Sequence, residues 1–301
     1  MRSERNKKIH FTINHHNNVP ISFIHKRNFY GFIGEEINPK DVKIIFQGGS
    51  TGAEIWKPRK DSIVENLNTL LKNNGFDKKI YNTSVNGKSI RGYIYDFDNW
   101  FKKIPNFNPE IVIFYLGIND RYYIDDDLHR FHDFQHSSKQ YKIIRDYIKN
   151  NSFFLYKYKT IENRYFPKNI IRYEKTKENL YNNYHYINYH EAKKNFTKIN
   201  VNDVKHLEIL NSRLDDLKKT IELNEIQPIF ITQIKFDGLS KRLFLVNEEI
   251  KKFAIENNYK LIPLDELISN IGPGDFFDEY HTTISGSKKI SDVIYKHLDF
   301  D

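Results

Sequence analysis

A serine near the start of the chain and an Asp-x-x-His pattern near its end have the residue types of a catalytic triad. Ser50 follows two glycines directly after a short apolar run, and Asp278 lies three residues before His281. A serine hydroxyl becomes a nucleophile when a base takes its proton, and an imidazole does this near neutral pH. A carboxylate holds that imidazole in the right tautomer. The three residues therefore predict acyl-transfer chemistry.

Two further polar segments follow apolar runs between these points. Gly87 ends a Ser-Val-Asn-Gly segment, and Asn119 stands in a Gly-Ile-Asn-Asp segment. Attack by a serine creates an oxyanion, which needs hydrogen-bond donors already in place. We expect these donors to be the backbone N–H groups of Ser50 and Gly87 and the side-chain amide of Asn119. Each segment alone also fits an ordinary turn or helix cap, so the prediction depends on all four occurring together.

Five short apolar runs have the character of buried parallel strands, because they are β-rich and continuous rather than alternating. They span residues 42–47, 79–85, 110–116, 227–233 and 259–264. Helical spacing of apolar residues predicts helices over 61–73, 206–224, 243–257 and 285–298. This alternation predicts a three-layer α/β/α sandwich with a five-stranded parallel, flavodoxin-like sheet. The polar segments would then meet at the carboxyl edge of that sheet, where open α/β folds place their sites.

The chain divides into an N-terminal extension, residues 1–40, and a main domain, residues 41–301. Residues 121–205 separate the third and fourth strands and are too many for a simple crossover. We expect a largely helical insertion, with a helix around 138–161. Because it directly follows Asn119, we interpret it as a cap over the site. A peripheral decoration without substrate contact is the alternative.

In this order and strand context, the four segments resemble the four blocks of the SGNH (GDSL-like) hydrolase superfamily. Those blocks contribute Ser, Gly, Asn and His, which here match Ser50, Gly87, Asn119 and His281, with Asp278 as the acid of the last block. The resemblance covers residues from about 40 to 120 and from about 205 to 298. It implies a hydrolase that acts on carboxylic esters.

The first block departs from the common Gly-Asp-Ser pattern and reads Gly-Gly-Ser-Thr at 48–51. That version occurs in one branch of the superfamily, and residues 28–36 resemble the leader of the branch. Many of its members are membrane-anchored or act on surface polysaccharides. The resemblance thus implies an O-acyl ester, above all an O-acetyl ester, of a carbohydrate. An O-acetyltransferase of surface polysaccharides and a non-catalytic assembly protein that retains the site are the alternatives.

Composition limits the partners and cofactors. The net charge of +8 lacks an Arg-rich stripe, and AT-rich codons explain it equally well, so we expect a small-molecule or glycan ester as ligand and no nucleic acid. The chain has no cysteine, which excludes thiol catalysis. His129, His132 and His136 form a cluster without a recognised ligand pattern, so we expect no metal and no cofactor.

One aromatic and one charged residue lie close in sequence to the expected site. Trp56 and Arg91 lie within a few residues of Ser50 and Gly87 and are candidates for lining the pocket.

The apolar runs are too short to span a bilayer, and the first twenty residues lack the apolar core of a secretory signal. We expect no membrane span in this chain, although a removed anchor would fit it. A cytoplasmic and an extracytoplasmic location both stay open.

Overall fold

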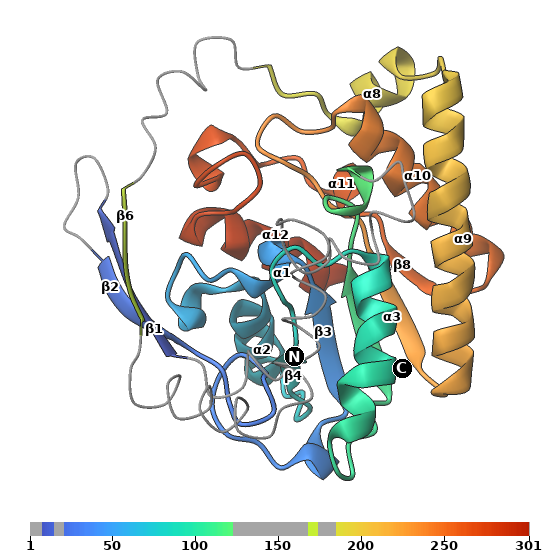
Figure 1. Cartoon of the computed structure of the whole chain (residues 1–301). Coiled ribbons are helices and arrows are strands. Elements are labelled where there is room, and N and C mark those ends of the chain that lie inside the picture. Colours follow the sequence, from blue (N-terminus) through green and yellow to red (C-terminus); the bar gives the residue numbers. More distant parts are fainter. Residues whose placement is uncertain (1–7, 15–20, 123–167, 174–184, 301) are drawn as a thin grey trace, which may run out of the picture.

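The computed structural model describes residues 8–14, 21–122, 168–173 and 185–300. Within them the five expected strands form a parallel sheet in the order β4-β3-β5-β7-β8 (Figure 1). Their bounds are Ile80–Asn82 for β4, Ile44–Gly48 for β3, Ile111–Tyr115 for β5, Gln227–Ile231 for β7 and Lys260–Ile262 for β8. Numbered along the chain, this is the 2-1-3-4-5 order of flavodoxin-like folds, so the predicted fold class is confirmed.

Side chains of the central strands enter two separate cores. Along β3, Ile44 and Phe46 belong to one core and Ile45 to the other, and β5 alternates in the same way. Both strands are buried throughout, which explains why their sequences are continuously apolar.

Helices cover both faces of the sheet and form the outer layers. One face is covered by α2 (Ile63–Asn73), α11 (Leu264–Leu267) and α12 (Ile284–His297). The other is covered mainly by α3 (Ile90–Asn99), α9 (Val201–Leu223) and α10 (Lys241–Glu256).

Among the longer helices, α9 and α3 differ most from the sequence-based expectation. α9 begins five residues earlier than expected, because Asn200 and Asp203 form a capping box at its start. α3 was not predicted, and Gly92 in its interior lowers its intrinsic helix propensity. Burial of Tyr93 and Phe97 against α9 compensates for that weakness.

A second, three-stranded sheet lies beside the main one, at the left in Figure 1. Its strands are β2 (Ile21–Lys26), β1 (Lys8–Asn14) and β6 (Lys168–Tyr173) in that order, with β1 antiparallel to β2 and parallel to β6. We call it the accessory sheet. The expected N-terminal extension and the expected insertion therefore each contribute strands to one structure, which the sequence did not predict.

Most of the expected cap, including the helix around 138–161, lies outside the described residues. The described remainder contains β6 and α8 (Tyr189–Asn195). α8 packs on α10, where the rings of Tyr189 and Phe196 each lie 6.0 Å from that of Phe244. The cap and the domain boundaries thus remain predictions.

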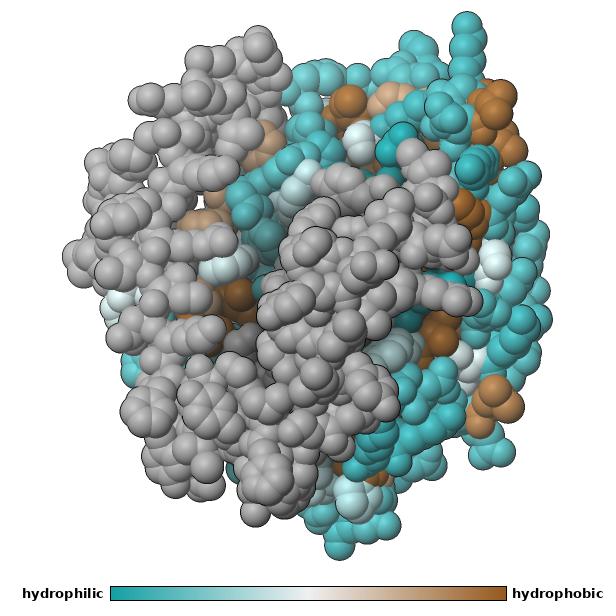
Figure 2. Space-filling model, viewed as in Figure 1, coloured by the Kyte–Doolittle hydropathy of each residue, from teal (hydrophilic) through white to brown (hydrophobic). Residues whose placement is uncertain are grey.

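The described surface in Figure 2 is mainly hydrophilic, with apolar side chains scattered over it. Among the described ranges, no helix combines the length and the apolar content that a bilayer crossing requires.

Candidate active site

Ser50 stands where β3 ends, as the first residue of the short helix α1 (Ser50–Ala53). The side-chain oxygen of its neighbour Thr51 accepts a hydrogen bond of 2.9 Å from the amide of Gln233. Ser50 Oγ itself makes no hydrogen bond to the residues that the structure describes. The hydroxyl is therefore held by its backbone at the carboxyl edge of the sheet and is not engaged in capping a neighbour.

Asn119 lies directly against the residue before Ser50. Its Nδ2 donates a 2.6 Å hydrogen bond to the carbonyl oxygen of Lys88, and a Cβ at position 49 would overlap that nitrogen. Because an amide NH2 has two donors, one N–H remains for a substrate. The close approach leaves no room for a side chain at position 49 while Asn119 keeps this place.

Gly87 lies in the turn after β4, on the same rim. Val85 N, in that turn, donates to the carbonyl of Gly48 at 3.1 Å, which keeps the turn beside the end of β3. Gly87 has φ +78, a conformation that favours glycine, and a Cβ there would meet no described atom within 4 Å. No side chain of the described residues therefore packs against Gly87 on the side where a Cβ would stand.

Gln233 ties two of these loops together, although the sequence did not single it out. Besides donating to Thr51, its side-chain oxygen accepts from Ile118 N at 2.7 Å, and the side chain is buried. One amide thus bonds to the residue after Ser50 and to the residue before Asn119. The position at the end of a predicted strand was the available signal, but its partners lie too far away in sequence to be inferred.

Asp278 and His281 form a compact turn, closed by a bridge between Phe276 and Thr282. The Asp278 carboxylate accepts from His281 Nδ1 at 2.8 Å and from the backbone N–H groups of Tyr280 and His281 at 2.9 Å each. Burial alone would raise the pKa of Asp278, but the hydrogen bonds from the His281 ring and these backbone groups outweigh it and lower the pKa. Asp278 is therefore held as a carboxylate.

The contact with Asp278 sets the tautomer of His281. An ionised carboxylate only accepts, so Nδ1 carries the proton and Nε2 carries the lone pair. Nε2 is buried and has no hydrogen-bond partner among the described residues. The structure thus brings Asp278 and His281 together, whereas no hydrogen bond joins Ser50 Oγ to His281. Such bonds often tighten only in the substrate complex.

A buried ion pair joins the His281 turn to the helix of Ser50. Lys57 Nζ lies 2.6 Å from Glu54 Oε1, and their side chains are 6% and 2% exposed. Thr282 Oγ1 donates to the same Glu54 oxygen at 2.8 Å, and Lys57 donates to the carbonyl of Thr283 at 3.1 Å. Both charged groups also bond to the hydroxyl of Ser287 on α12.

This Glu54–Lys57 pair gives a short path between the two halves of the site. Glu54 N donates to the carbonyl of Ser50 at 2.9 Å, and its carboxylate holds Thr282, the residue after His281. Burial lowers the pKa of Lys57, and the neighbouring Glu54 opposes that shift. The sequence did not predict the pair, because neither residue belongs to a recognisable motif.

A second buried ion pair lies behind Gly87 and Asn119. Lys88 bonds to Asp96 on α3, and the two side chains are 1% and 0% exposed. Asp96 also accepts from the amide of Gln47 at 3.3 Å, and Lys88 Nζ lies 5.2 Å from the ring centre of Trp100. The side chain of Lys88 is thus anchored, and its carbonyl is fixed where it accepts from Asn119.

The two residues considered for lining the pocket, Trp56 and Arg91, differ in their position relative to His281. The Trp56 ring meets the His281 ring edge-on, with 6.2 Å between their centres, and meets the Phe11 ring of the accessory sheet at 5.4 Å. Arg91 lies in the first turn of α3 and does not line the cavity beside Trp56. Asp120 accepts from Ile90 N at 3.0 Å, a bond that braces the start of α3.

The histidine cluster considered as a metal site does not fall within the described ranges. His129, His132 and His136 lie outside them, and His185 bonds to Glu191 at 2.7 Å. No group of three or more potential metal ligands occurs among the residues that the structure covers.

The chain matches no protein-family model, and no curated protein matches it. Similar solved structures include a lipolytic protein of the G-D-S-L family from Desulfitobacterium hafniense, with 12% identity and a TM-score of 0.48 over 85% of this chain and 99% of that one. A lipolytic G-D-S-L protein from Veillonella parvula has 16% identity and a TM-score of 0.47, over 85% and 97%. An acetylxylan esterase from Geobacillus stearothermophilus has 12% identity and a TM-score of 0.46, over 86% and 95%.

The resemblance to a family therefore depends on the residues and on the topology of this chain itself. The sheet order places the ends of β3, β4 and β5 side by side, and the Glu54–Lys57 pair attaches the His281 turn to them. The chain resembles the SGNH hydrolase superfamily in the segments of Ser50, Gly87, Asn119 and Asp278–His281, and the sheet order places the first three after neighbouring strands.

Proposed function

We propose that the protein is a serine esterase that hydrolyses O-acyl esters through an acyl-enzyme on Ser50. The observation that carries the proposal is the His281 ring, which Asp278 orients and whose buried Nε2 has no partner among the described residues. A buried polar atom without a partner is costly, so its retention favours a role in proton transfer.

Each step of the reaction has a residue to perform it. Ser50 Oγ attacks the ester carbon while His281 Nε2 takes its proton, and the carbonyl oxygen becomes an oxyanion. The Asn119 amide and the backbone N–H groups of Ser50 and Gly87 stabilise that charge. The carbon–oxygen bond to the alcohol then breaks, and His281 returns the proton to the leaving oxygen. Water then attacks the acyl-enzyme while His281 takes its proton. The bond to Ser50 Oγ breaks, His281 returns the proton to Ser50, and the acid is released.

For the substrate, we propose an O-acetyl ester of a carbohydrate, the class that the Gly-Gly-Ser-Thr branch implies. Transfer to a sugar hydroxyl would use the same steps with the hydroxyl in place of water. The two outcomes separate when a reaction with an acetyl donor is run with and without added oligosaccharide, and the products are weighed by mass spectrometry.

The direct test is hydrolysis of 4-nitrophenyl acetate by the wild type, Ser50→Ala and His281→Ala. We expect turnover by the wild type and background rates for both variants. Ser22→Ala and His297→Ala are matched controls that should retain the wild-type rate, because both residues are exposed and neither lines the cavity nor belongs to the Asp278–His281 turn or α1. Unchanged activity in Ser50→Ala would refute the proposed mechanism.

A further inference from the structure

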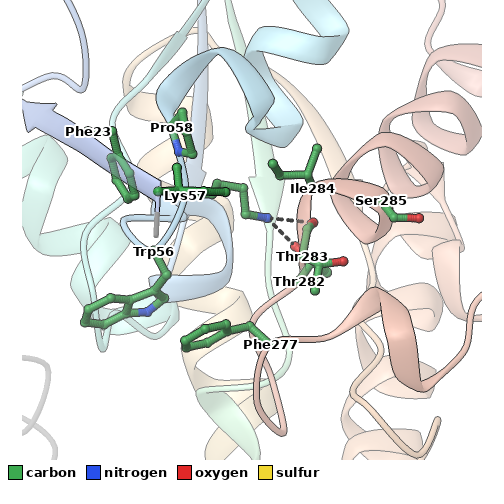
Figure 3. Close-up of a pocket in the computed structure, with 10 residues that line it drawn as sticks. Phe23, Trp56, Lys57, Pro58, Phe277, Thr282, Thr283, Ile284 and Ser285 are labelled. Atoms are coloured by element: carbon green, nitrogen blue, oxygen red, sulfur yellow. Dashed lines mark hydrogen bonds between the residues drawn. The ribbon is translucent and has the colours of Figure 1, made fainter. Parts of the chain in front are cut away.

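A cavity of about 230 Å³ lies between the accessory sheet and the turn that carries His281 (Figure 3). Ile21 and Phe23 line it from β2. Trp56 and Pro58 line it from the loop after α1, and Phe277 and Ile284 flank the Asp278–His281 turn. Aromatic and aliphatic side chains from three separate parts of the chain therefore meet around one space.

The polar groups of the remaining lining residues are turned toward other partners. Lys57 Nζ and Thr282 Oγ1 belong to the network around Glu54, as Figure 3 shows for the lysine. Thr283 Oγ1 donates to the carbonyl of Gly274 at 3.0 Å, and Ser285 Oγ donates to Asp275 at 2.7 Å. A sugar hydroxyl that entered the cavity would lose its water while these four side chains stay bonded to other groups, which is unfavourable. The cavity is therefore suited to an apolar group.

The position of the cavity indicates which part of an ester would enter it. Trp56 contacts the His281 ring, and Phe277 and Thr282 adjoin the Asp278–His281 turn on either side. In acyl transfer the histidine returns its proton to the leaving oxygen, so the leaving alcohol lies on the histidine side. A group that extends from that alcohol past His281 would reach the cavity.

We propose that this cavity binds an apolar group of the leaving alcohol, an inference that rests on the proposed esterase function. Its volume is below the roughly 300–1,000 Å³ of pockets for drug-sized ligands, which suits one aromatic ring or a short alkyl chain. An alcohol that is a sugar would then need an apolar substituent near the ester. The accessory sheet, through Ile21 and Phe23, would set this specificity.

Two ester series test the proposal, one that varies the alcohol and one that varies the acid. For ethyl, butyl and hexyl acetate, we expect kcat/KM of the wild type to rise by up to about fourfold per methylene until the cavity is filled. For ethyl acetate, ethyl butyrate and ethyl hexanoate, in which only the acid becomes longer, we expect no such rise. A rise in the acyl series alone, or the same kcat/KM throughout both series, would overturn the proposal.

A filled cavity gives the second test, with a control on the same strand. Ile21→Trp should remove most of the advantage of hexyl over ethyl acetate. Ile24→Trp should retain it, because Ile24 is 52% exposed and does not line the cavity. Equal loss in the two variants would contradict a role for the cavity. Thermal unfolding shows whether each variant folds. If Ile21→Trp does not fold, Phe23→Ala takes its place and should lower the ratio of kcat/KM for hexyl acetate to that for ethyl acetate.

Failure of the cavity proposal and failure of the proposed function give different results. A wild type that hydrolyses ethyl acetate without a chain-length preference refutes the cavity proposal alone. A wild type that neither hydrolyses any of these esters nor reacts at Ser50 refutes the esterase function as well.

Discussion

Two buried ion pairs support opposite sides of the candidate site. They differ in the sequence separation between the segments that they hold together. Lys88–Asp96 stands behind the expected oxyanion donors and joins residues on neighbouring segments, eight positions apart. Glu54–Lys57 stands beneath the expected base and holds Thr282, which lies 228 positions beyond Glu54.

The difference reflects how each half of the site reaches the rim. Ser50, Gly87 and Asn119 follow strands that are neighbours in the sheet, so the strand ladder itself aligns them. The His281 turn comes after the last strand and is placed by side chains and by α12. We therefore expect the base side to depend on a long-range polar clamp, and the oxyanion side to tolerate loss of its local pair better.

Of all the variants considered, removal of the base should lower kcat most. His281→Ala should lower kcat for 4-nitrophenyl acetate by about 10⁴-fold or more, because it removes the group assigned to take the serine proton. Steady-state kinetics measure this. A loss of less than tenfold would mean that the two sides of the site do not have the roles assigned to them.

Breaking each ion pair compares the two sides directly. Glu54→Gln and Asp96→Asn should each lower the free energy of unfolding by about 3–5 kcal/mol, because each removes the carboxylate charge that a buried lysine faces. Glu54→Gln should also lower kcat by the larger factor, since it releases the His281 turn. Urea denaturation and kinetics on the same samples measure both effects.

A double variant and a surface control sharpen that result. Glu54→Gln with Lys57→Met should be more stable than Glu54→Gln alone, because no unpaired charge remains. Asp98→Asn, which removes the exposed pair with Lys102, should change the free energy of unfolding by no more than about 1 kcal/mol. Equal kcat in Glu54→Gln and Asp96→Asn would contradict the proposed asymmetry.

On the oxyanion side, Asn119→Ala should lower kcat by about 10²–10³-fold with little change in KM. Gly49→Ala should cause a similar loss, because its methyl group would displace the Asn119 amide. If both act through that amide, the double variant should be no worse than Asn119→Ala alone. Kinetics of the three variants test this, and fully additive losses would show that Gly49 acts elsewhere.

The smallest effect concerns the pH dependence of stability. The folded pKa of Asp278 is lowered, so its contribution to stability is present above the unfolded pKa and is lost as pH falls through the folded pKa. The difference in free energy of unfolding between wild type and Asp278→Asn should therefore be largest near neutral pH and shrink in acid. Urea denaturation at pH 7, 5 and 3 measures it, and a difference that grows in acid would have the wrong sign.

The sequence predicted the main sheet because each strand carries a local signal, a continuous apolar run that ends in polar or glycine residues. It missed the accessory sheet. β1 alternates, with Ile9 and Phe11 buried and His10 exposed, but its basic, His/Asn-rich surroundings hid that pattern. Its pairing with β6 joins segments more than 150 residues apart, which local periodicity does not encode.

The same distinction applies to the candidate site. The strand-end positions of Ser50 and Asn119, and the Asp-x-x-His spacing of Asp278 and His281, could be predicted from the sequence. Glu54, Lys57 and Gln233 could not, because their importance comes only from partners that folding brings near. The predicted cap is still untested, since most of it lies beyond the described residues.

Labelling with a fluorophosphonate probe tests the central claim most directly, because it requires an activated serine but no knowledge of the substrate. Intact-mass and peptide mass spectrometry should find one adduct, on Ser50, in the wild type and in Ser22→Ala. Labelling should be lost in Ser50→Ala and strongly slowed in His281→Ala. A wild type that remains unlabelled, or an adduct that persists in Ser50→Ala, would contradict the assignment of Ser50 as a nucleophile activated by His281.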